Sequence, residues 1–406
     1  MTYDVIVVGA GPAGSIAARE CASAGLHTLL IEKEIMPRDK PCGGAVMYRG
    51  LRIINNKFPS SLVERKIYGM QFEFPSGRNA KFKSDKLMGI TVNRAYFDEY
   101  LAHQAVDAGA ALMEDTRVKD ARISRDNITI KTDEGDELTG SILIGADGVN
   151  TTVGRCVGLR PKRKDLSRVG LGMESDFHVG VKGVLQATDD DPSILQILPV
   201  PGRAAYGWVF PKEEDLAIGI AGGALHMHPL RPMFESFRQQ LEKRLSLELK
   251  PTKRRTHFIG GWGIHNKNVT NRVMLIGDAA GWVDPMMGEG IAYAMRSGVI
   301  SAKIAQDAIN LNRYDSTFLE EYHQECVKEC SGNFGMAAWA GSRGSDFAES
   351  LLVKATRLDI ASDLMAMVAR GELTYSDIPS RVIRDLPREL PNIIRQIITN
   401  HIYTSH

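Results

Sequence analysis

The stretch Asp4-Val5-Ile6-Val7-Val8-Gly9-Ala10-Gly11-Pro12-Ala13-Gly14-Ser15 decides the fold. It is a continuous apolar run followed by Gly-x-Gly-x-x-Gly and then by a helix-favouring segment, residues 15–23. An apolar run of this kind is typical of a parallel strand that is buried on both faces. In such a unit Gly9 permits a tight turn, Gly11 lets the backbone approach a pyrophosphate, and Gly14 lets the helix pack closely on the strand.

The segment after the glycines completes a nucleotide-binding pattern. The N-terminus of the predicted helix offers free N–H groups and a positive dipole end to phosphates. A second apolar run, Thr28-Leu29-Leu30-Ile31, ends at Glu32. A carboxylate about 20 residues beyond the glycines is where a dinucleotide ribose is bound. Strand, glycines, helix, strand and acid therefore predict a dinucleotide-binding βαβ unit.

Composition narrows the class of protein. The chain has 406 residues, of which 43% are hydrophobic and 24% charged, which is typical of a globular protein with two or three domains. The formal net charge is +1, so we expect no nucleic-acid partner. Five cysteines without paired CxxC motifs indicate neither a disulfide framework nor a metal site. No apolar run approaches the roughly 20 residues of a membrane span, and no signal-like leader precedes the first strand, so we expect a cytoplasmic protein.

Two later apolar runs also end in an acidic residue beside glycine. Ser141-Ile-Leu-Ile-Gly-Ala-Asp147-Gly148 is the first, and Arg272-Val-Met-Leu-Ile-Gly277-Asp278 is the second. Ligands of open α/β sheets lie beyond the carboxyl ends of the strands, so we expect both carboxylates near the nucleotide. The loop Gly288-Glu289-Gly290 precedes a predicted helix, residues 290–310, and its N–H groups can face an electron-rich ring edge.

The intervening segments are strand-rich and predict a second, antiparallel domain. Residues 66–83 alternate as a hairpin, and residues 168–260 are strand-rich around a predicted helix at 232–245. In Ala205-Tyr206-Gly-Trp208-Val-Phe210-Pro211 the three aromatic side chains share one face, because a strand has a period of two. They form either part of a sheet core or an apolar wall beside a ligand.

Together these motifs resemble the superfamily of aromatic-hydroxylase flavoproteins over roughly residues 1–330. The resemblance is carried by the glycines with Glu32, by Arg94 before a predicted helix, by residues 145–148, and by Gly277-Asp278 with Pro285. Within it, the closer likeness is to the geranylgeranyl reductases. The motifs that resemble that family are Pro41-Cys42-Gly43-Gly44, the aromatic strand at 206–211, and Gly277-Asp-Ala-Ala-Gly281.

The resemblance implies a p-hydroxybenzoate hydroxylase-like α/β fold with three parts. A Rossmann-like FAD-binding domain would comprise residues 1–65, 95–165 and 261–330. A β-rich substrate domain would comprise residues 66–94 and 166–260. Residues 331–406 would form a C-terminal helical region.

The resemblance also implies FAD as the cofactor and a set of site residues. The residues expected at the cofactor are Gly9, Gly11, Ala13, Gly14, Glu32, Lys33, Cys42, Gly43, Gly44, Ala45, Arg94, Val118, Asp147, Gly277, Asp278, Gly288, Gly290 and Ile291. The residues expected at the substrate are Tyr206, Trp208 and Phe210. Cys42 is the candidate catalytic residue, in proton transfer or substrate positioning, although a small thiol packed against the flavin is equally compatible with the sequence.

The implied activity is saturation of isolated C=C bonds in isoprenoid chains. Membrane ether-lipid precursors are the favoured substrates, and chlorophyll- or quinone-type precursors are the alternative within the family. A flavin monooxygenase acting on a small aromatic compound, or a flavin-binding partner protein without turnover, are the competing hypotheses. Only one dinucleotide fingerprint is present, so an external electron donor, ferredoxin or a reduced nicotinamide, is expected.

Three further features have competing interpretations. Cys326 and Cys330 lie one helical turn apart and are either a redox pair or buried thiols. His226-Met-His228 lacks a third ligand nearby and is not expected to bind metal. The C-terminal helices, including Leu351, Ile393-Ile394 and Ile397-Ile398 beside Arg388 and Arg395, fit either core packing or a basic, apolar surface that rests on a membrane.

Overall fold

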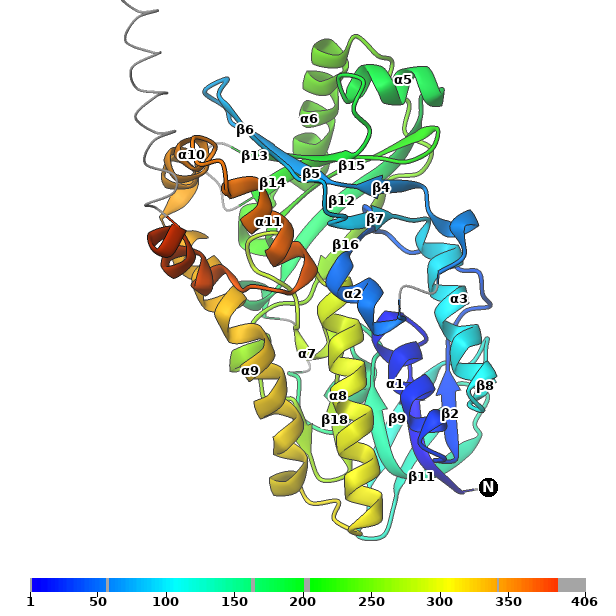
Figure 1. Ribbon diagram of the computed structural model, residues 1–406. Helices are drawn as coiled ribbons and strands as arrows, with labels where there is room; N and C mark the ends of the chain where they lie inside the picture. Colours follow the sequence, from blue (N-terminus) through cyan, green and yellow to red (C-terminus); the bar gives the residue numbers. More distant parts are fainter. Residues whose placement is uncertain (1, 56–57, 162–164, 201–204, 342, 386–406) are drawn as a thin grey trace, which may run out of the picture.

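The computed structural model describes residues 2–55, 58–161, 165–200, 205–341 and 343–385. The first apolar run forms a central strand, β1 (Thr2–Val8), which pairs in parallel with strands on both sides (Figure 1). The order in this sheet is β17-β18-β11-β1-β2-β8, and β9 and β10 extend it from β11. Its other strands are β2 (Thr28–Ile31), β8 (Ala111–Met113), β9 (Val118–Ile123), β10 (Ile128–Thr132), β11 (Glu137–Gly145), β17 (Val269–Thr270) and β18 (Val273–Leu275).

Two helices pack against each other beside this sheet, α1 (Pro12–Ser23) and α8 (Ile291–Asn310). They approach closely because Gly298 faces α1: a Cβ added there would lie 2.5 Å from the carbonyl oxygen of Ala13. The remaining helices of this layer are α2 (Tyr48–Ile53), α3 (Arg94–Asp107), α4 (Thr152–Cys156) and α7 (Gly277–Ala280).

A second, mostly antiparallel sheet lies above the first in Figure 1. Its order is β16-β12-β15-β14-β13-β5-β6, in which only the β13–β5 pairing is parallel. Its strands are β5 (Gly69–Glu73), β6 (Asn79–Lys83), β12 (Gly170–His178), β13 (Ile194–Pro199), β14 (Ala205–Pro211), β15 (Asp215–Gly223) and β16 (Arg255–Ile259). Helix α6 (Leu230–Leu245) packs its apolar side chains against β12 and β15, and α5 (Gly180–Ala187) contacts β15.

A three-stranded sheet joins the two layers. It consists of β3 (Ala45–Met47), β7 (Gly89–Thr91) and β4 (Arg65–Ile67), and both of its outer strands run antiparallel to β7. The predicted hairpin at 66–83 is thus divided, because β4 belongs to this small sheet while β5 and β6 belong to the large one.

The C-terminal helices flank both layers (Figure 1). Helix α9 (Ser316–Gly341) packs along α8, and its continuous course runs through the domain boundary predicted at residue 331. Helix α10 (Gly344–Ala355) and helix α11 (Ala361–Arg370) contact β6, and the short helix η5 (Tyr375–Asp377) contacts α9. The predicted membrane-facing residues 388–398 lie outside the described residues. Among the described helices, none is both long and apolar enough to cross a membrane.

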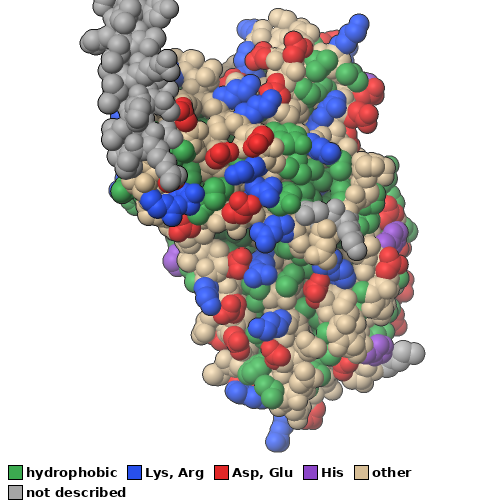
Figure 2. Space-filling model, viewed as in Figure 1, with side chains coloured by type: hydrophobic (Ala, Val, Ile, Leu, Met, Phe, Trp, Pro, Cys, Tyr) green, Lys and Arg blue, Asp and Glu red, His purple; other side chains and the backbone are tan. Residues whose placement is uncertain are grey.

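The predicted fold class is confirmed: a Rossmann-like parallel sheet is combined with an antiparallel sheet and C-terminal helices. The division into domains by residue range stays a prediction. On the face shown in Figure 2, basic and acidic side chains are interspersed, in agreement with the formal net charge of +1.

The close contact between α1 and α8 can be tested with two glycine substitutions. We expect Gly298→Ala to destabilise the protein by about 2 kcal/mol, because the added methyl overlaps the backbone of α1. Gly335, in α9, is exposed with open space around its Cα, so Gly335→Ala should stabilise by about 0.5–1 kcal/mol. Thermal unfolding followed by circular dichroism measures both. Equal melting temperatures for the two variants would contradict the close contact between Gly298 and the backbone of α1.

Candidate active site

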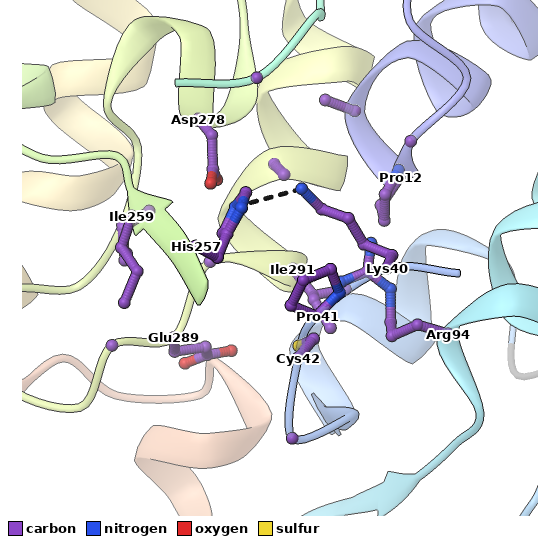
Figure 3. A pocket seen from close by; sticks show the side chains of 18 of the residues that line it. Pro12, Lys40, Pro41, Cys42, Arg94, His257, Ile259, Asp278, Glu289 and Ile291 are labelled. Atoms are coloured by element: carbon purple, nitrogen blue, oxygen red, sulfur yellow. Dashed lines mark hydrogen bonds between the residues drawn. The ribbon is translucent and has the colours of Figure 1, made fainter. Parts of the chain in front are cut away.

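A cavity of about 700 Å³ connects the strand tips of the first sheet with the face of the second. Gly9, Gly11 and Glu32 line one end, and Trp208 and Phe210 line the other. Figure 3 shows the middle of this cavity, where side chains from both sheets and from the intervening loops meet. Its size lies in the range of small-molecule and cofactor sites.

The glycine turn after β1 shapes the first end. Gly9 has φ +103°, and a Cβ on it would lie 2.5 Å from the carbonyl oxygen of Ala146. A Cβ on Gly14 would lie 1.9 Å from the carbonyl oxygen of Gly9. Gly11, in contrast, has only the Arg38 guanidinium within 4 Å of such an atom. The turn is therefore packed tightly at Gly9 and Gly14 and open at Gly11. At this open side the N-terminus of α1 can bind an anion.

Glu32 begins a chain of buried charges along the same wall. Its Oε2 accepts a hydrogen bond of 2.9 Å from the Ala10 N–H and lies 3.3 Å from Nε of Arg38. Arg38 donates to Asp98 at 3.0 Å, and Arg94 donates to both oxygens of Asp98 at 2.8 and 2.9 Å. Two arginines and two carboxylates balance one another, so the wall is rigid and electrically compensated. Glu32 and Arg94 belong to the sequence motifs, whereas Arg38 was not predicted, because its only signal in the sequence is that it is a basic residue in a loop.

Asp147, at the tip of β11, serves two purposes. Its Oδ2 accepts the N–H groups of Thr152, at 2.6 Å, and Val153, at 3.1 Å, at the start of α4. Its Oδ1 is buried without a hydrogen-bond partner, and the residue lines the cavity. Burial raises the pKa of this carboxyl despite the two N–H donors. An unpartnered buried oxygen at a strand tip is suited to a bound polar ligand.

The loop before α8 meets the second sheet. Gly290 precedes the first residue of α8, and a Cβ added to it would lie 3.5 Å from Oδ1 of Asp278, which lines the cavity (Figure 3). Tyr206 of β14 donates a hydrogen bond of 2.9 Å to the carbonyl oxygen of Met287. Gly288 has φ +64°, and a Cβ there would lie 2.0 Å from the Tyr206 hydroxyl. The aromatic strand and this loop thus form one continuous wall.

The Cys42 loop is held against the aromatic strand. A Cβ on Gly43 would lie 2.7 Å from the Phe210 ring and 2.9 Å from the Trp208 indole nitrogen. The Cys42 N–H donates to Glu174 at 2.7 Å, and burial raises the pKa of Glu174 to about 7. The three aromatic residues of this strand therefore face the cavity, with ring centroids of successive residues 6.2 Å apart.

A lysine–histidine pair crosses the cavity and was also missed by the sequence analysis. Nζ of Lys40 lies 3.1 Å from Nε2 of His257 on β16 (Figure 3). Burial lowers the pKa of Lys40, and the nearby Asp278 opposes that shift. The pair connects the loop of the first layer to the second sheet. Neither residue belongs to a local motif, so no pattern in the chain pointed to it.

The structure brings nearly all predicted site residues to this one cavity. Those that line it are Gly9, Gly11, Ala13, Glu32, Lys33, Cys42, Gly43, Gly44, Ala45, Arg94, Val118, Asp147, Tyr206, Trp208, Phe210, Asp278, Gly288, Gly290 and Ile291. Gly14 and Gly277 lie behind the wall: Gly14 packs against Gly9, and the Gly277 N–H donates to Ser297 at 3.0 Å. The structure thus places these two glycines in close packing behind the cavity wall, and their contact with the cofactor stays a prediction.

Two other motifs, the Cys326–Cys330 pair and His226-Met-His228, are not part of the lining of this cavity. Cys326 and Cys330 are buried free thiols, and burial raises the pKa of both. Within the described ranges, no group of three or more His, Cys, Asp or Glu side chains is arranged to hold a metal ion.

The residues of the cavity fit a flavin dinucleotide. A glycine turn open to the start of α1 suits a pyrophosphate, and Glu32 lies where a ribose hydroxyl can be bound. The unpartnered Oδ1 of Asp147 and the side chain of Asp278 offer further polar contacts along the strand tips. The cavity then continues past Gly290 to the aromatic strand.

Comparisons with known proteins agree with this fit. A family model described as an FAD binding domain matches residues 2–331. A digeranylgeranylglycerophospholipid reductase of Methanosphaera stadtmanae is 31% identical over 340 residues, which is 79% of this chain and 81% of that protein. The digeranylgeranylglycerophospholipid reductase of Thermoplasma acidophilum is 27% identical over 422 aligned positions that cover 98% of both chains. The crystal structure of a geranylgeranyl bacteriochlorophyll reductase-like protein from T. acidophilum has a TM-score of 0.76 at 23% identity, covering 98% of this chain and 99% of that one.

Glu32 provides a direct test of the cofactor site. We expect Glu32→Ala to weaken FAD binding about 10- to 100-fold, because a charge-assisted contact is lost and the Ala10 N–H and Arg38 lose their acceptor. Flavin fluorescence titration of the apoprotein measures the dissociation constant. Glu134→Ala, on an exposed turn, is the control and should bind FAD like the wild type. An affinity of Glu32→Ala within about threefold of the control would contradict the assignment.

Proposed function

Because the chain belongs to the FAD-binding domain family and groups there with the geranylgeranyl reductases, we propose that this FAD-dependent oxidoreductase saturates isolated C=C bonds of geranylgeranyl chains on membrane ether-lipid precursors. The observation that carries the proposal is the change in polarity along the cavity. Charged and polar groups line the end near Glu32, whereas the far end is lined mainly by apolar side chains, with Arg49 and Glu289 among them. The apolar lining residues are Met47, Met70, Leu195, Ile197, Phe210, Met287, Met365, Val368 and Ala369.

The apolar end is built from three separate segments of the chain, β5, β13 and α11. Met70 and Ile197 come from neighbouring strands of the second sheet, and Met365 and Ala369 come from α11, which closes the cavity from the C-terminal side. An isoprenoid chain makes no hydrogen bonds and gains free energy from burial, at about 0.8 kcal/mol per CH₂. An apolar channel formed by two strands and a helix therefore suits a long hydrocarbon substrate better than a small polar aromatic compound.

The proposed reaction requires two things of the apolar end of the cavity: exclusion of water and a nearby proton donor. Bound FAD, once reduced, supplies a hydride, and a proton must reach the other carbon of the double bond. An isolated alkene has no carbonyl group to spread charge, so the site must exclude water and hold a proton donor close to the alkene. Trp208 and Phe210 with the α11 residues exclude water, and binding of the remote chain positions the reacting bond.

Cys42 has a proposed role at the junction of the polar and apolar ends. Its Sγ accepts a hydrogen bond of 3.4 Å from the Gly44 N–H, and its side chain lies beside the Arg94 guanidinium. Both contacts fix the thiol where the Pro/Gly loop meets the aromatic strand. We assign Cys42 to contact with the flavin and positioning of the substrate.

Membrane contact through the C-terminal helices completes the proposal. The exposed large apolar side chains there include Trp339 at the end of α9 and Leu351 on α10. Helices α10 and α11 follow one another, and α11 lines the apolar end. A lipid that enters from a membrane would reach the cavity by this side, and the external electron donor, ferredoxin or a reduced nicotinamide, would supply electrons to the flavin.

The proposed reaction can be measured directly. FAD-loaded protein reduced anaerobically with dithionite is incubated with a digeranylgeranyl ether phospholipid, and the lipid is analysed by mass spectrometry. We expect a gain of two mass units for each double bond. A geranylgeranylated chlorophyll-type precursor and a small phenol, the latter with oxygen, serve as competing substrates. An unchanged lipid together with turnover of either competitor would overturn the proposal.

The apolar end can be tested by filling it. We expect Ala369→Phe to lower geranylgeranyl reduction about 10-fold or more, because the added ring occupies the space of the chain, while FAD affinity stays unchanged. Reduction of a shorter geranyl compound should be affected less. Val106→Phe, on the exposed face of α3, is the matched control. Equal loss of long- and short-chain reduction would argue against a channel at α11.

A further inference from the structure

The cavity wall also carries a buried carboxyl group, that of Glu289, beside Arg49. Glu289 belongs to the loop before α8, and its side chain is 10% exposed. Its Oε2 lies 3.1 Å from Nη2 of Arg49, whereas its Oε1 is buried without a hydrogen-bond partner. Figure 3 shows Glu289 and Cys42 in the same cavity, on neighbouring parts of the wall. A carboxyl oxygen that is buried, unpartnered and on the wall is costly to keep charged.

The groups that face Glu289 leave one negative charge in excess. Within the described part of the chain, Arg49, from α2, is the one cation among them, and Glu289 and Asp284 are two carboxyls. Tyr293, from α8, accepts a hydrogen bond of 2.6 Å from Arg49, and Tyr375, from η5, lies beside the same groups. One guanidinium cannot neutralise two buried carboxylates, so the cluster favours the uptake of one proton.

Asp284 is also buried, its Oδ2 has no hydrogen-bond partner, and burial raises the pKa of its carboxyl, but the donors on its other oxygen place the proton on Glu289. Oδ1 of Asp284 accepts the N–H groups of Met286, at 2.8 Å, and Met287, at 3.0 Å, which favour its charged form. Glu289 has no such donors besides Arg49. Burial, together with the charge of Asp284, raises the pKa of Glu289 to about 7 although Arg49 opposes the shift.

We propose that Glu289 is the acid that protonates the alkene, an inference that rests on the function proposed above. In the step, the O–H bond of the Glu289 carboxyl breaks and its proton forms a C–H bond at one alkene carbon. The other carbon receives a hydride, with its two electrons, from reduced FAD, and the π bond is lost. Glu289 is left as a carboxylate beside Arg49 and regains a proton from water before the next turnover.

A second buried carboxyl, Glu174, has a competing position but a different environment. Its Oε1 is already engaged by the Cys42 N–H at 2.7 Å, and its neighbours Asp176, Lys212 and Arg255 form a charged cluster. Glu289, in contrast, lies next to Met287 at the apolar end. Glu174 therefore fixes the Cys42 loop, and its substitution provides a matched comparison.

The test compares Glu289→Gln with Glu174→Gln in FAD-loaded, prereduced protein, over single turnovers with the geranylgeranyl lipid at pH 5.5 to 9. In the wild type the rate should fall as the pH rises through about 7, because the protonated carboxyl is the active form. Glu289→Gln should lower the rate about 100-fold or more and abolish this inflection, whereas Glu174→Gln should keep the inflection. Glu289→Asp, which keeps an acid in a retracted position, should be slow but retain the pH dependence.

An infrared pH titration of the oxidised holoprotein gives a readout that needs no turnover. The C=O band of a protonated carboxyl that disappears near neutral pH should be smaller in Glu289→Gln than in the wild type. An unchanged band, or an active Glu289→Gln with its inflection intact, would overturn this proposal while leaving the reductase activity standing. A wild type that saturates no double bond would instead overturn the proposed function and this step together, even where the band is present.

Discussion

The structure depends on the backbone contact between the glycine turn after β1 and the tip of β11. Gly9 lies against the carbonyl group of Ala146, and Gly14 lies against Gly9 itself. Any side chain at either position would push the two strand tips or the helix apart. Because β18 is paired with β11, the same contact also fixes where α7 begins, with Asp278 in its first turn. The ends of β1, β11 and β18 are therefore held in close contact, and this contact fixes the position of the cavity.

The second sheet is joined to this point through loops rather than through an extended interface of its own. The Cys42 loop runs from the first layer onto the aromatic strand, where Gly43 allows contact with Trp208 and Phe210. The loop before α8 reaches the same strand through the hydrogen bond from Tyr206 to Met287. Both loops contribute residues to the lining of the cavity. A change in either loop would therefore alter the cofactor and substrate sides together, which explains why the motif glycines cluster there.

The sequence predicted the parts of the site that are local in the chain. The order of strand, glycine turn, helix and acid is contained in residues 4–32, and Tyr206, Trp208 and Phe210 share a face by strand period alone. The contacts that depend on chain segments far apart were not predictable in this way. Lys40 meets His257 across 217 positions, and no single-sequence pattern encodes such a distance. The same reason explains the divided hairpin, since strand periodicity does not specify which sheet a strand joins.

The two ends of the cavity differ in how their buried charges are balanced. At the nucleotide end each buried arginine is matched by a carboxylate, so that the wall is neutral and its groups are already engaged. At the apolar end one arginine faces two carboxyls. A carboxylate of this cluster therefore binds a proton at neutral pH more readily than a carboxylate exposed to water does. A compensated cluster holds a ligand in place, whereas an uncompensated cluster stores a proton and can release it. Both arise from burial of charge, and the clusters differ by a single arginine, which decides whether the carboxylates are fully compensated.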